Sequence, residues 1–470
     1  MGLRLSATLA AFAMLAGCTV APLPELKPPL PTAWRNAPAA AAAPRPDLRD
    51  WWRAFDDPAL DALVERALQN NPGVAEAAER LRAERMLYPH AHGAYMPTLE
   101  AGTNDVINPD TSASYFVVGF DATWELPLFG AWQSASRLAQ GNLDAAAADW
   151  QGARVSLVAE VVRRWIELRA AQHQERLLAA VLAADREKLR LLQVQQRLQL
   201  AAPDQIDAAT AVCDEDEAAL AAPRRRIDAS AQQLAVLLGQ PEPDPSWLQA
   251  GPEPQLGQWQ LDSVPADLLR TQPQIARAQA DVLHAAGELG ISRADIYPHI
   301  GLGTALQWSV RIADNHRART GESIFSLGPI INIPLFDWGQ RVARAHANDH
   351  ELKAAVYAYR QAVLQGVADT ETALGDLHQL RGRVLAMEHA VQALDQATAV
   401  VRKRDALGLD STLQVLDSTV RQRRAQIDLA SARAERDLAY VALYKSLGGA
   451  PLPAADMPAA GRADTRGASP

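Results

Sequence analysis

The sequence lacks the features that define several common protein classes. Its 470 residues include only two cysteines, Cys18 and Cys213, which excludes a disulfide scaffold and a cysteine-based zinc site. After residue 18 no stretch approaches the ~20 uncharged apolar residues of a membrane-spanning helix, so a helical integral membrane protein is excluded. With a net charge of −9, the chain also lacks the basic surface that a nucleic-acid-binding protein needs.

The composition and the helical periodicity point to very long helices. Alanine makes up roughly one residue in five, while aromatic residues are scarce at 6%. No proline occurs between Leu335 and Ala450, and the run from Trp338 to about Arg404 would reach ~100 Å as a helix. Helices of this length cannot bury their apolar stripes in one compact domain. We therefore expect them to pack against each other and against neighbouring chains as coiled coils.

The first residues have the pattern of a lipoprotein signal. Arg4 precedes an apolar run from Leu5 to Met14, which has the length of a signal-peptide core. The run ends in Leu15-Ala16-Gly17-Cys18, which resembles the lipobox of bacterial lipoproteins. This resemblance implies a signal peptide over 1–17 and acyl chains on Cys18, followed by a proline-rich tether within 18–56. An ordinary secretory peptide with an incidental cysteine is the alternative.

The rest of the chain has the pattern of an internal tandem repeat. Asn71-Pro72-Gly73-Val74-Ala75 matches Gln272-Pro273-Gln274-Ile275-Ala276 at an offset of 201. Pro127-Leu128-Phe129 matches Pro334-Leu335-Phe336 at an offset of 207. Further identical residues at the same offset follow over about seventy residues. We predict two tandem copies. Their boundaries are repeat 1 at 57–238, a linker at 239–265, repeat 2 at 266–450 and a flexible tail at 451–470.

Each copy contains two stretches in which apolar residues alternate with small or polar ones. Such alternation predicts strands, and about ten residues suffice to cross a bilayer when a strand is tilted. Half of a soluble sheet is the alternative interpretation. Because four strands cannot close a barrel, a membrane-spanning version must pool strands from several chains. The strands are expected at about 98–106, 115–126, 299–310 and 323–333, with polar loops at 104–114 and 311–323.

Several motifs together resemble the outer-membrane efflux, or TolC-like, family, and specifically its lipoprotein branch (NodT/OprM-like) that serves RND-type tripartite pumps. The resemblance covers essentially the whole mature chain. Its carriers are the lipobox, Trp51-Trp52, Asn71-Pro72, Tyr297-Pro298, Leu327-Gly328-Pro329, the stretch from Pro334 to Gly339, Gly408 to Asp417, and Leu443 to Gly449.

The resemblance implies a mainly α fold with a membrane β-barrel. Each copy would supply a two-stranded β-hairpin and a very long coiled-coil helical hairpin, and a homotrimer would form a shared twelve-stranded barrel and a twelve-helix tunnel. It implies an outer-membrane, lipid-anchored location with a periplasmic helical extension. It also implies a periplasmic adaptor and an inner-membrane pump as partners, and a gated passive exit duct for small toxic compounds.

A periplasmic aperture is the first site that the resemblance implies. The family places an aspartate that faces its symmetry mates at the position of Asp417, and Asp207 follows the first tip similarly. Three carboxylates in a narrow ring attract cations and raise one another's pKa. Gln414 stands where many relatives have a second aspartate, which implies a weaker charge here. The alternative for both aspartates is a solvated position on a helix.

The two hairpin tips are the second implied site, because they would meet the adaptor's helical hairpins. Gly408 would allow close backbone approach, and Pro203 departs from a regular turn. The tips lie at 200–204 and 407–411, with the contact residues Leu200, Ala201, Pro203, Asp204, Leu407, Gly408, Leu409, Asp410 and Ser411.

The sequence has few motifs that are typical of enzymes, and we expect neither catalysis nor a cofactor. His346 and His350 share a helical face, but they lack the glutamate of a metallopeptidase helix and a third ligand. Cys213 lies beside acidic residues that disfavour a thiolate. Two alternative functions stay open at this point: the outer-membrane duct of a type I protein-secretion system, and a periplasmic coiled-coil lipoprotein without a pore.

Overall fold

The computed structural model describes residues 22–28, 30–36, 47–106, 115–257, 267–311 and 323–450. The predicted signal peptide, Cys18, most of both polar loops, part of the predicted linker and the tail at 451–470 lie outside the described residues. The chain divides into two compact units. The first contains residues 78–149 and 274–363, and the second contains 30–77, 150–273 and the residues from 364 onward.

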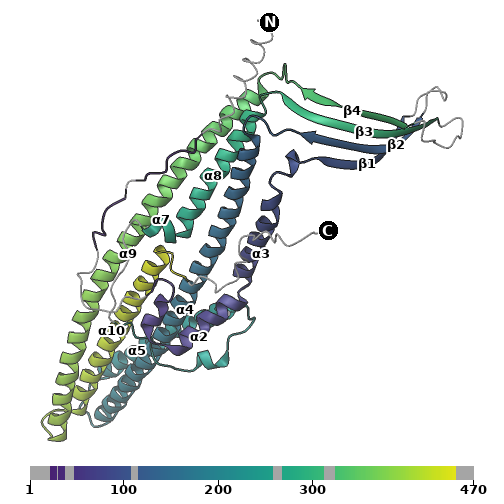
Figure 1. The fold of residues 1–470 in the computed structure, drawn as a ribbon. Coiled ribbons are helices and arrows are strands. Elements are labelled where there is room, and N and C mark those ends of the chain that lie inside the picture. Colours follow the sequence, from purple (N-terminus) through teal and green to yellow (C-terminus); the bar gives the residue numbers. More distant parts are fainter. Residues whose placement is uncertain are drawn as a thin grey trace, which may run out of the picture. The chain divides into compact units, whose positions relative to one another are not determined.

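The predicted mainly helical fold with a small antiparallel sheet is confirmed (Figure 1). Among the described residues, no helix is both long enough and apolar enough to cross a membrane. The helices are α2 (Pro58–Asn70), α3 (Pro72–Leu87), α4 (Ala131–Arg197), α5 (Pro203–Ala219), α6 (Ala221–Leu237), α7 (Leu268–Thr271), α8 (Pro273–Ala294), α9 (Gln340–Ala406) and α10 (Thr412–Ser446). The strands are β1 (Thr98–Val106), β2 (Tyr115–Glu125), β3 (His299–Arg311) and β4 (Ser323–Asn332).

The first unit holds the sheet, whose strands follow one another in the order β1-β2-β3-β4 (Figure 1). All three pairings are antiparallel, and representative partners are Thr98 with Thr123, Thr123 with Gly303, and His299 with Asn332. The central pairing of β2 with β3 joins the two halves of the sequence. Among the described strands, one edge of β1 and one edge of β4 have no partner.

Glycines allow the helices of the first unit to approach closely. A Cβ added to Gly141 of α4 would collide with the backbone of His284 in α8. A Cβ on Gly287 of α8 would likewise collide with the backbone of Leu138 in α4. The absence of side chains at these two crossing points therefore sets the spacing between α4 and α8.

The core of the second unit is built around aromatic side chains from both ends of the chain. Trp51 is fully buried and stacks on Tyr444 of α10, with 5.4 Å between ring centroids. The Tyr440 hydroxyl donates to the Trp51 carbonyl, and the Trp51 indole N–H donates to the Gly449 carbonyl. These contacts fasten the N-terminal segment to the end of α10.

The expectation that the proline-rich segment is only an extended tether is wrong for residues 30–36. Trp34 is buried, and the backbone N–H groups of Arg35 and Asn36 donate to the Glu371 carboxylate of α9. Trp51, further along the same segment, belongs to the aromatic core. Aromatic residues spaced between prolines give the segment anchoring points that its overall composition conceals.

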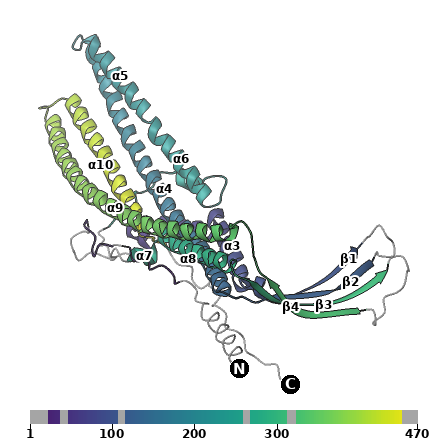
Figure 2. The same ribbon diagram turned by 90° about the horizontal axis from the view of Figure 1, so that it is seen from above.

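Two helical hairpins complete the second unit, one formed by α4 with α5 and α6, the other by α9 with α10 (Figures 1 and 2). The returning arm of the first hairpin is interrupted at Leu220, between α5 and α6. Pro223 causes this interruption because it has no N–H to donate to the carbonyl of Ala219. In the second hairpin, α10 runs unbroken for 35 residues.

The same backbone conformations recur 209 residues apart. Helices α4 and α9 both have 67 residues and begin 209 positions apart. The offset of 207 that the matching letters suggest therefore does not hold for α9, because Phe336 and Asp337 lengthen the approach to this helix by two residues. Left-handed backbone (positive φ) follows the same offset at Phe129 and Trp338, Gly130 and Gly339, Gln199 and Gly408, and Gly239 and Gly448.

A reciprocal pair of substitutions tests the role of left-handed backbone at the tips. Gln199 has a φ of 60°, which costs a non-glycine residue ~1 kcal/mol, whereas Gly408 adopts a φ of 72° freely. We expect Gln199→Gly to raise the free energy of unfolding by up to ~1 kcal/mol and Gly408→Gln to lower it by about as much. Denaturation of the purified protein measures both.

Gln196→Gly is the matched control, because it makes the same replacement inside α4. There glycine lowers helix stability by ~1 kcal/mol. If Gln199→Gly and Gln196→Gly destabilise the protein equally, the left-handed conformation at Gln199 carries no strain.

Candidate functional site

Both hairpin tips end in the same turn, built from the last residues of α4 and of α9. At the first tip the Leu200 N–H donates to the Gln195 carbonyl at 2.8 Å, and at the second the Leu409 N–H donates to the Arg404 carbonyl at 2.9 Å. These six-residue closures, with a left-handed residue just before them, satisfy carbonyls that the helix ends leave free. The role expected for Gly408, close approach by a partner, thus has a local explanation in its positive φ.

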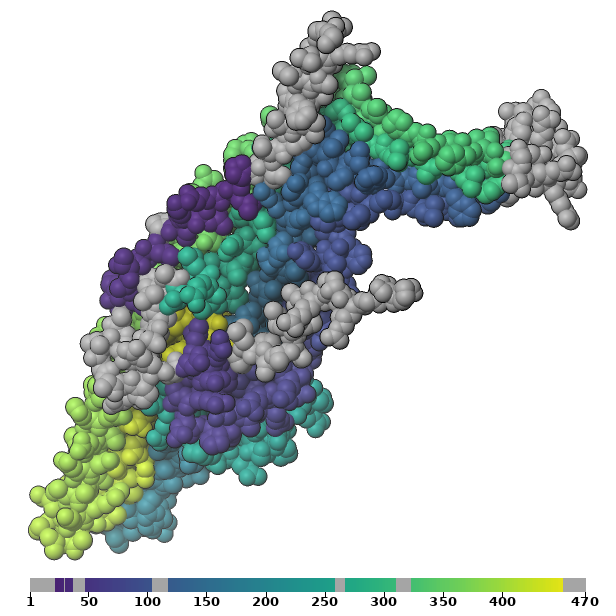
Figure 3. Space-filling model, in the orientation of Figure 1, coloured from purple at the N-terminus to yellow at the C-terminus, as the bar shows by residue number. Residues whose placement is uncertain are grey.

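The tips present exposed leucines. Leu198 and Leu200 flank the left-handed Gln199, and Leu407 and Leu409 flank Gly408; all four side chains are between 64% and 74% exposed. The two tips lie at the same end of the second unit (Figure 3). Apolar side chains held outward on rigid turns are suited to contact with another protein.

The first tip lies two residues earlier than predicted. The turn occupies 198–202, so Leu200 and Ala201 belong to it, whereas Pro203 and Asp204 form the first turn of α5. Pro203 occupies the first helical position, where the missing N–H costs nothing and the fixed φ suits the helix. It therefore starts a helix rather than replacing a turn.

The second tip is held by polar contacts of its own. Asp410 accepts from the Arg404 guanidinium at 2.8 Å, and Ser411 is the N-cap of α10. The Gln414 side chain accepts from the Ser411 N–H at 2.8 Å, while the Ser411 hydroxyl accepts from the Gln414 N–H. Gln414, which we assigned to the aperture, is thus part of a capping box within one chain.

Asp417 forms an ion pair within the chain. The Lys188 ammonium of α4 donates to the Asp417 carboxylate at 2.6 Å, and both side chains are partly exposed. Asp207 is exposed on α5. By the offset of 209, the counterpart of Asp417 is Ala208, so Asp207 is turned by about 100° from the equivalent helical position. The two aspartates therefore do not occupy matching faces of their helices.

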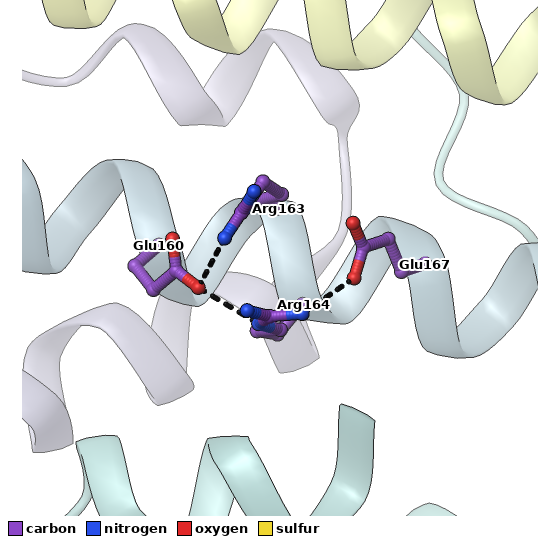
Figure 4. A network of polar contacts seen from close by, with 4 residues as sticks. All are labelled: Glu160, Arg163, Arg164 and Glu167. Carbon is purple, nitrogen blue, oxygen red and sulfur yellow. Dashed lines mark hydrogen bonds and ion pairs between the residues drawn. The ribbon is translucent and has the colours of Figure 1, made fainter. Parts of the chain in front are cut away.

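A second charged cluster lies along α4 (Figure 4). The Glu160 carboxylate accepts from Arg163 at 2.6 Å and from Arg164 at 2.7 Å, and Arg164 also donates to Glu167. Burial alone would raise the pKa of Glu160, but the hydrogen bonds and charges of the two arginines outweigh it and lower that pKa. Sequence reasoning missed this cluster, although the i, i+3 and i, i+4 spacing predicts such pairs.

The sheet of the first unit exposes apolar side chains along β4 and beyond. Ile324, Phe325 and Leu327 are all at least 60% exposed, and Trp338, just before α9, is 90% exposed. Phe129, in the equivalent position before α4, instead stacks on Tyr297 with 4.6 Å between ring centroids. The aromatic residue before α4 is therefore covered by a side chain of the same chain, whereas the equivalent residue before α9 is exposed.

Residues considered for other chemistry do not come together. His346 and His350 are both exposed on α9, and no group of three or more potential metal-ligating side chains occurs in the described ranges. Burial raises the pKa of the Cys213 thiol, and the carboxylates of Asp185 and Asp216 raise it further.

The fold and these sites match known proteins. The family model described as "Outer membrane efflux protein" matches residues 63–240 and, a second time, residues 264–449. The chain belongs to the outer membrane efflux protein family. The predicted resemblance is confirmed.

Relatives of this family align over nearly the full chain. The pyoverdine export outer membrane protein OpmQ of Pseudomonas aeruginosa is 26% identical over 96% of this chain and 97% of its own length. Nodulation protein T of Rhizobium leguminosarum bv. viciae is 26% identical over 81% of this chain and 80% of its own length. The solved outer-membrane channel OprN has a TM-score of 0.78 and 27% identity, over 91% of this chain and 99% of its own.

Membership of the efflux family defines the coarse function. The chain is an outer-membrane efflux channel, and its homologues are outer-membrane components of efflux pumps. The family consists of transporters rather than enzymes. The Campylobacter jejuni CmeC channel, at 16% identity and a TM-score of 0.79, supports the fold alone.

A double-mutant cycle measures the Lys188–Asp417 pair. Because both groups are partly exposed, we expect Lys188→Met and Asp417→Asn to show a coupling free energy of about 0.2–1 kcal/mol. The coupling should shrink as salt is added. Denaturation of the single and double variants at low and high ionic strength provides the measurement.

The exposed pair Arg186–Glu217, which also starts from α4, is the control cycle. Its coupling should be no larger than that of Lys188–Asp417, since its side chains are more exposed. Strict additivity of Lys188→Met and Asp417→Asn at low salt would show that the ion pair contributes nothing to stability.

Proposed function

We propose that this chain is the exit duct of a tripartite efflux pump, which carries small toxic compounds passively across the periplasm and the outer membrane through a gated channel. The main support is the combination of an open-edged sheet with two very long helical hairpins. A lipid anchor on Cys18, cleavage of residues 1–17, an RND-type inner-membrane pump and a periplasmic adaptor belong to the same proposal. The domain boundaries predicted above, including the tandem repeat, complete it.

The open sheet gives a physical reason for a homotrimer. In a bilayer, every unpaired backbone group costs several kcal/mol, and single-chain barrels begin at eight strands. A sheet of four strands whose two edges have no partner in the described part of the chain would therefore join strands of other copies. Three copies would give the twelve strands that the family resemblance implies.

The pairing inside the chain predicts the pairing between chains. Strand β3 corresponds to β1 at an offset of 201, and β2 corresponds to β4 at an offset of 209, since these offsets reproduce the observed registers. The observed partners Ala122 and Thr304 then translate into Ile331 and Thr103 of the partner subunit. In the same way, the contact of Phe129 with Tyr297 leads us to expect that the exposed Trp338 lies against Met96 of the partner subunit.

Paired cysteines test this register. We expect the double variant Ile331→Cys with Thr103→Cys to form disulfide-linked oligomers in the outer membrane, visible as bands of two or three chain masses in non-reducing gels. The control pairs Ile331→Cys with Gly102→Cys, a position where an added Cβ meets no other atom. A shift of one residue moves the side chain to the other face of the sheet, so this pair should stay unlinked. Efficient linking of the control pair alone would contradict the register.

The candidate sites have separate roles in the duct. The exposed leucines of the tips, with Pro203, Asp204, Asp410 and Ser411 around them, are proposed to contact the adaptor. Asp417, with Gln414 and Asp207 nearby, is proposed to line the periplasmic aperture. The ion pair with Lys188 means that a ring of three Asp417 carboxylates would be accompanied by three ammonium groups, which lowers its net charge.

Drug accumulation and conductance test the duct. A strain that lacks the gene should accumulate the compounds that the pump exports, and the wild-type gene should reverse this accumulation. The variant Cys18→Ser cannot carry the acyl chains, so its ability to reverse the accumulation shows whether export needs the lipid anchor in addition to barrel insertion. Purified protein should conduct in planar bilayers, and Asp417→Ala should increase conductance by loosening the aperture. Protein that never conducts, even as Asp417→Ala, would contradict the duct and favour a coiled-coil spacer. Loss of protein secretion without drug accumulation would favour a type I secretion duct.

A further inference from the structure

Two buried carboxyl groups face each other between α4 and α5. Asp185 of α4 is 6% exposed and Asp216 of α5 is 7% exposed. They lie close enough for a hydrogen bond between the two side chains, which requires that one of them carries a proton. Among the described residues, the buried Oδ2 atom of each carboxyl group has no donor as a hydrogen-bond partner. Neither the aperture nor the tips use these two residues.

The charged groups around the pair come from three helices. Arg424 of α10 donates to Asp216 Oδ1 at 3.2 Å. Lys188 lies one helical turn from Asp185, but its ammonium is paired with Asp417 of α10. Arg186 of α4 pairs with Glu217 of α5 at the exposed margin of the contact. On the apolar side, the pair adjoins a cluster formed by Leu182, Cys213 and Leu220. A single guanidinium, that of Arg424, thus contacts the pair, and it does so at Asp216 alone among the contacts of the described residues.

The second hairpin provides an internal comparison. At the offset of 209, Asp185 corresponds to Leu394 and Asp216 to Ala425. Leu182 and Leu220 correspond to Val391 and Leu429, which pack together in the second hairpin as well. The helical hairpin can therefore be packed at this level without a buried acid pair, so the pair in the first hairpin is not a requirement of packing.

We propose that Asp185 and Asp216 share one proton and form a pH-dependent latch that holds α4, α5 and α10 together in acid and loosens when both carboxyl groups ionise. When the shared proton leaves, two buried negative charges repel each other, and Arg424 compensates only one of them. Because Arg424 belongs to α10, this loosening extends to the contact between the two hairpins.

The direction of the pH dependence follows from the protonation of the pair. Burial, together with the hydrogen bond and the charge of Asp216, raises the pKa of Asp185 from 3.8 to about 6. The folded contact therefore holds a proton that the open form has already lost. Its stability is highest in acid, declines as the pH rises through about 6, and stays low above that pH. The latch does not depend on the proposed duct, since it concerns helix packing alone.

Hydrogen exchange tests the latch in the full-length purified protein. The amides of α5, residues 203–219, are compared in the wild type and in Asp185→Asn at pH 5 and at pH 7.5. The ratio of the two proteins at each pH cancels the chemical pH dependence of exchange. We expect the exchange rate of the wild type relative to that of Asp185→Asn to be about tenfold higher at pH 7.5 than at pH 5, because only the wild type loses the shared proton between these pH values.

Two further variants keep the test decisive. Glu215→Gln removes an exposed carboxylate beside Asp216 and should exchange like the wild type at both pH values. The double variant Asp185→Leu with Asp216→Ala copies the second hairpin and should show the pH independence of Asp185→Asn, even if a single amide packs poorly. A wild-type ratio that is unchanged between pH 5 and pH 7.5 against both variants would overturn the proposal.

Discussion

The outer edges of β1 and β4, which have no partner among the described strands, are the constraint on which the rest of the structure depends. A sheet of four strands leaves backbone N–H and C=O groups open along both sides, and the exposed apolar side chains of β4 favour a non-aqueous environment. The closure by copies of the same chain that we propose would satisfy both demands at once. Because register fixes the strand pairs, such closure would also determine which helices of neighbouring chains meet.

Residues with left-handed backbone separate the straight elements of the chain. Gly130 and Gly339 mark the starts of the two 67-residue helices, Gln199 and Gly408 mark the tips, and Gly239 and Gly448 follow the returning arms. A Cβ on Gly239 would collide with the Asn70 carbonyl, and one on Gly448 with the Thr271 carbonyl. The turns therefore fix the lengths of the helices and the return of each arm onto the start of its own half.

Short-range patterns in the sequence predicted the elements well, because periodicity reports directly on which face of an element is apolar. The alternation in Tyr115–Glu125 and in His299–Arg311 lies where the strands are found. The resemblance to the efflux family rested on motifs spread over the whole chain and was equally sound. The proline-free stretch after Leu335 holds α9 and α10 and is broken only around Gly408.

What the sequence could not provide are features that depend on contacts or on exact spacing. The identical residues at Pro127 and Pro334 suggested an offset of 207 between the copies, which is two less than the offset of 209 between the helices. Residue identities alone do not show where the backbone adopts the left-handed conformation. The contact of the Gln414 side chain with the Ser411 N–H, which closes the capping box of α10, was likewise not recognised from the sequence. The buried pair of Asp185 and Asp216 joins different helices, and both residues resemble ordinary surface charges in the sequence.

The interruption at Leu220 has a consequence for any tube built from this chain. Pro223 divides the returning arm of the first hairpin, whereas the equivalent position in α10 is Ala432 and that arm is continuous. In the homotrimer that we propose, the returning arms around the tube would alternate between the interrupted arm of α5 and α6 and the continuous α10. If the tube widened by bending at the interruptions, it would bend at three places rather than six. The opening would then have the threefold symmetry of the chains and not the approximate sixfold symmetry of their repeats.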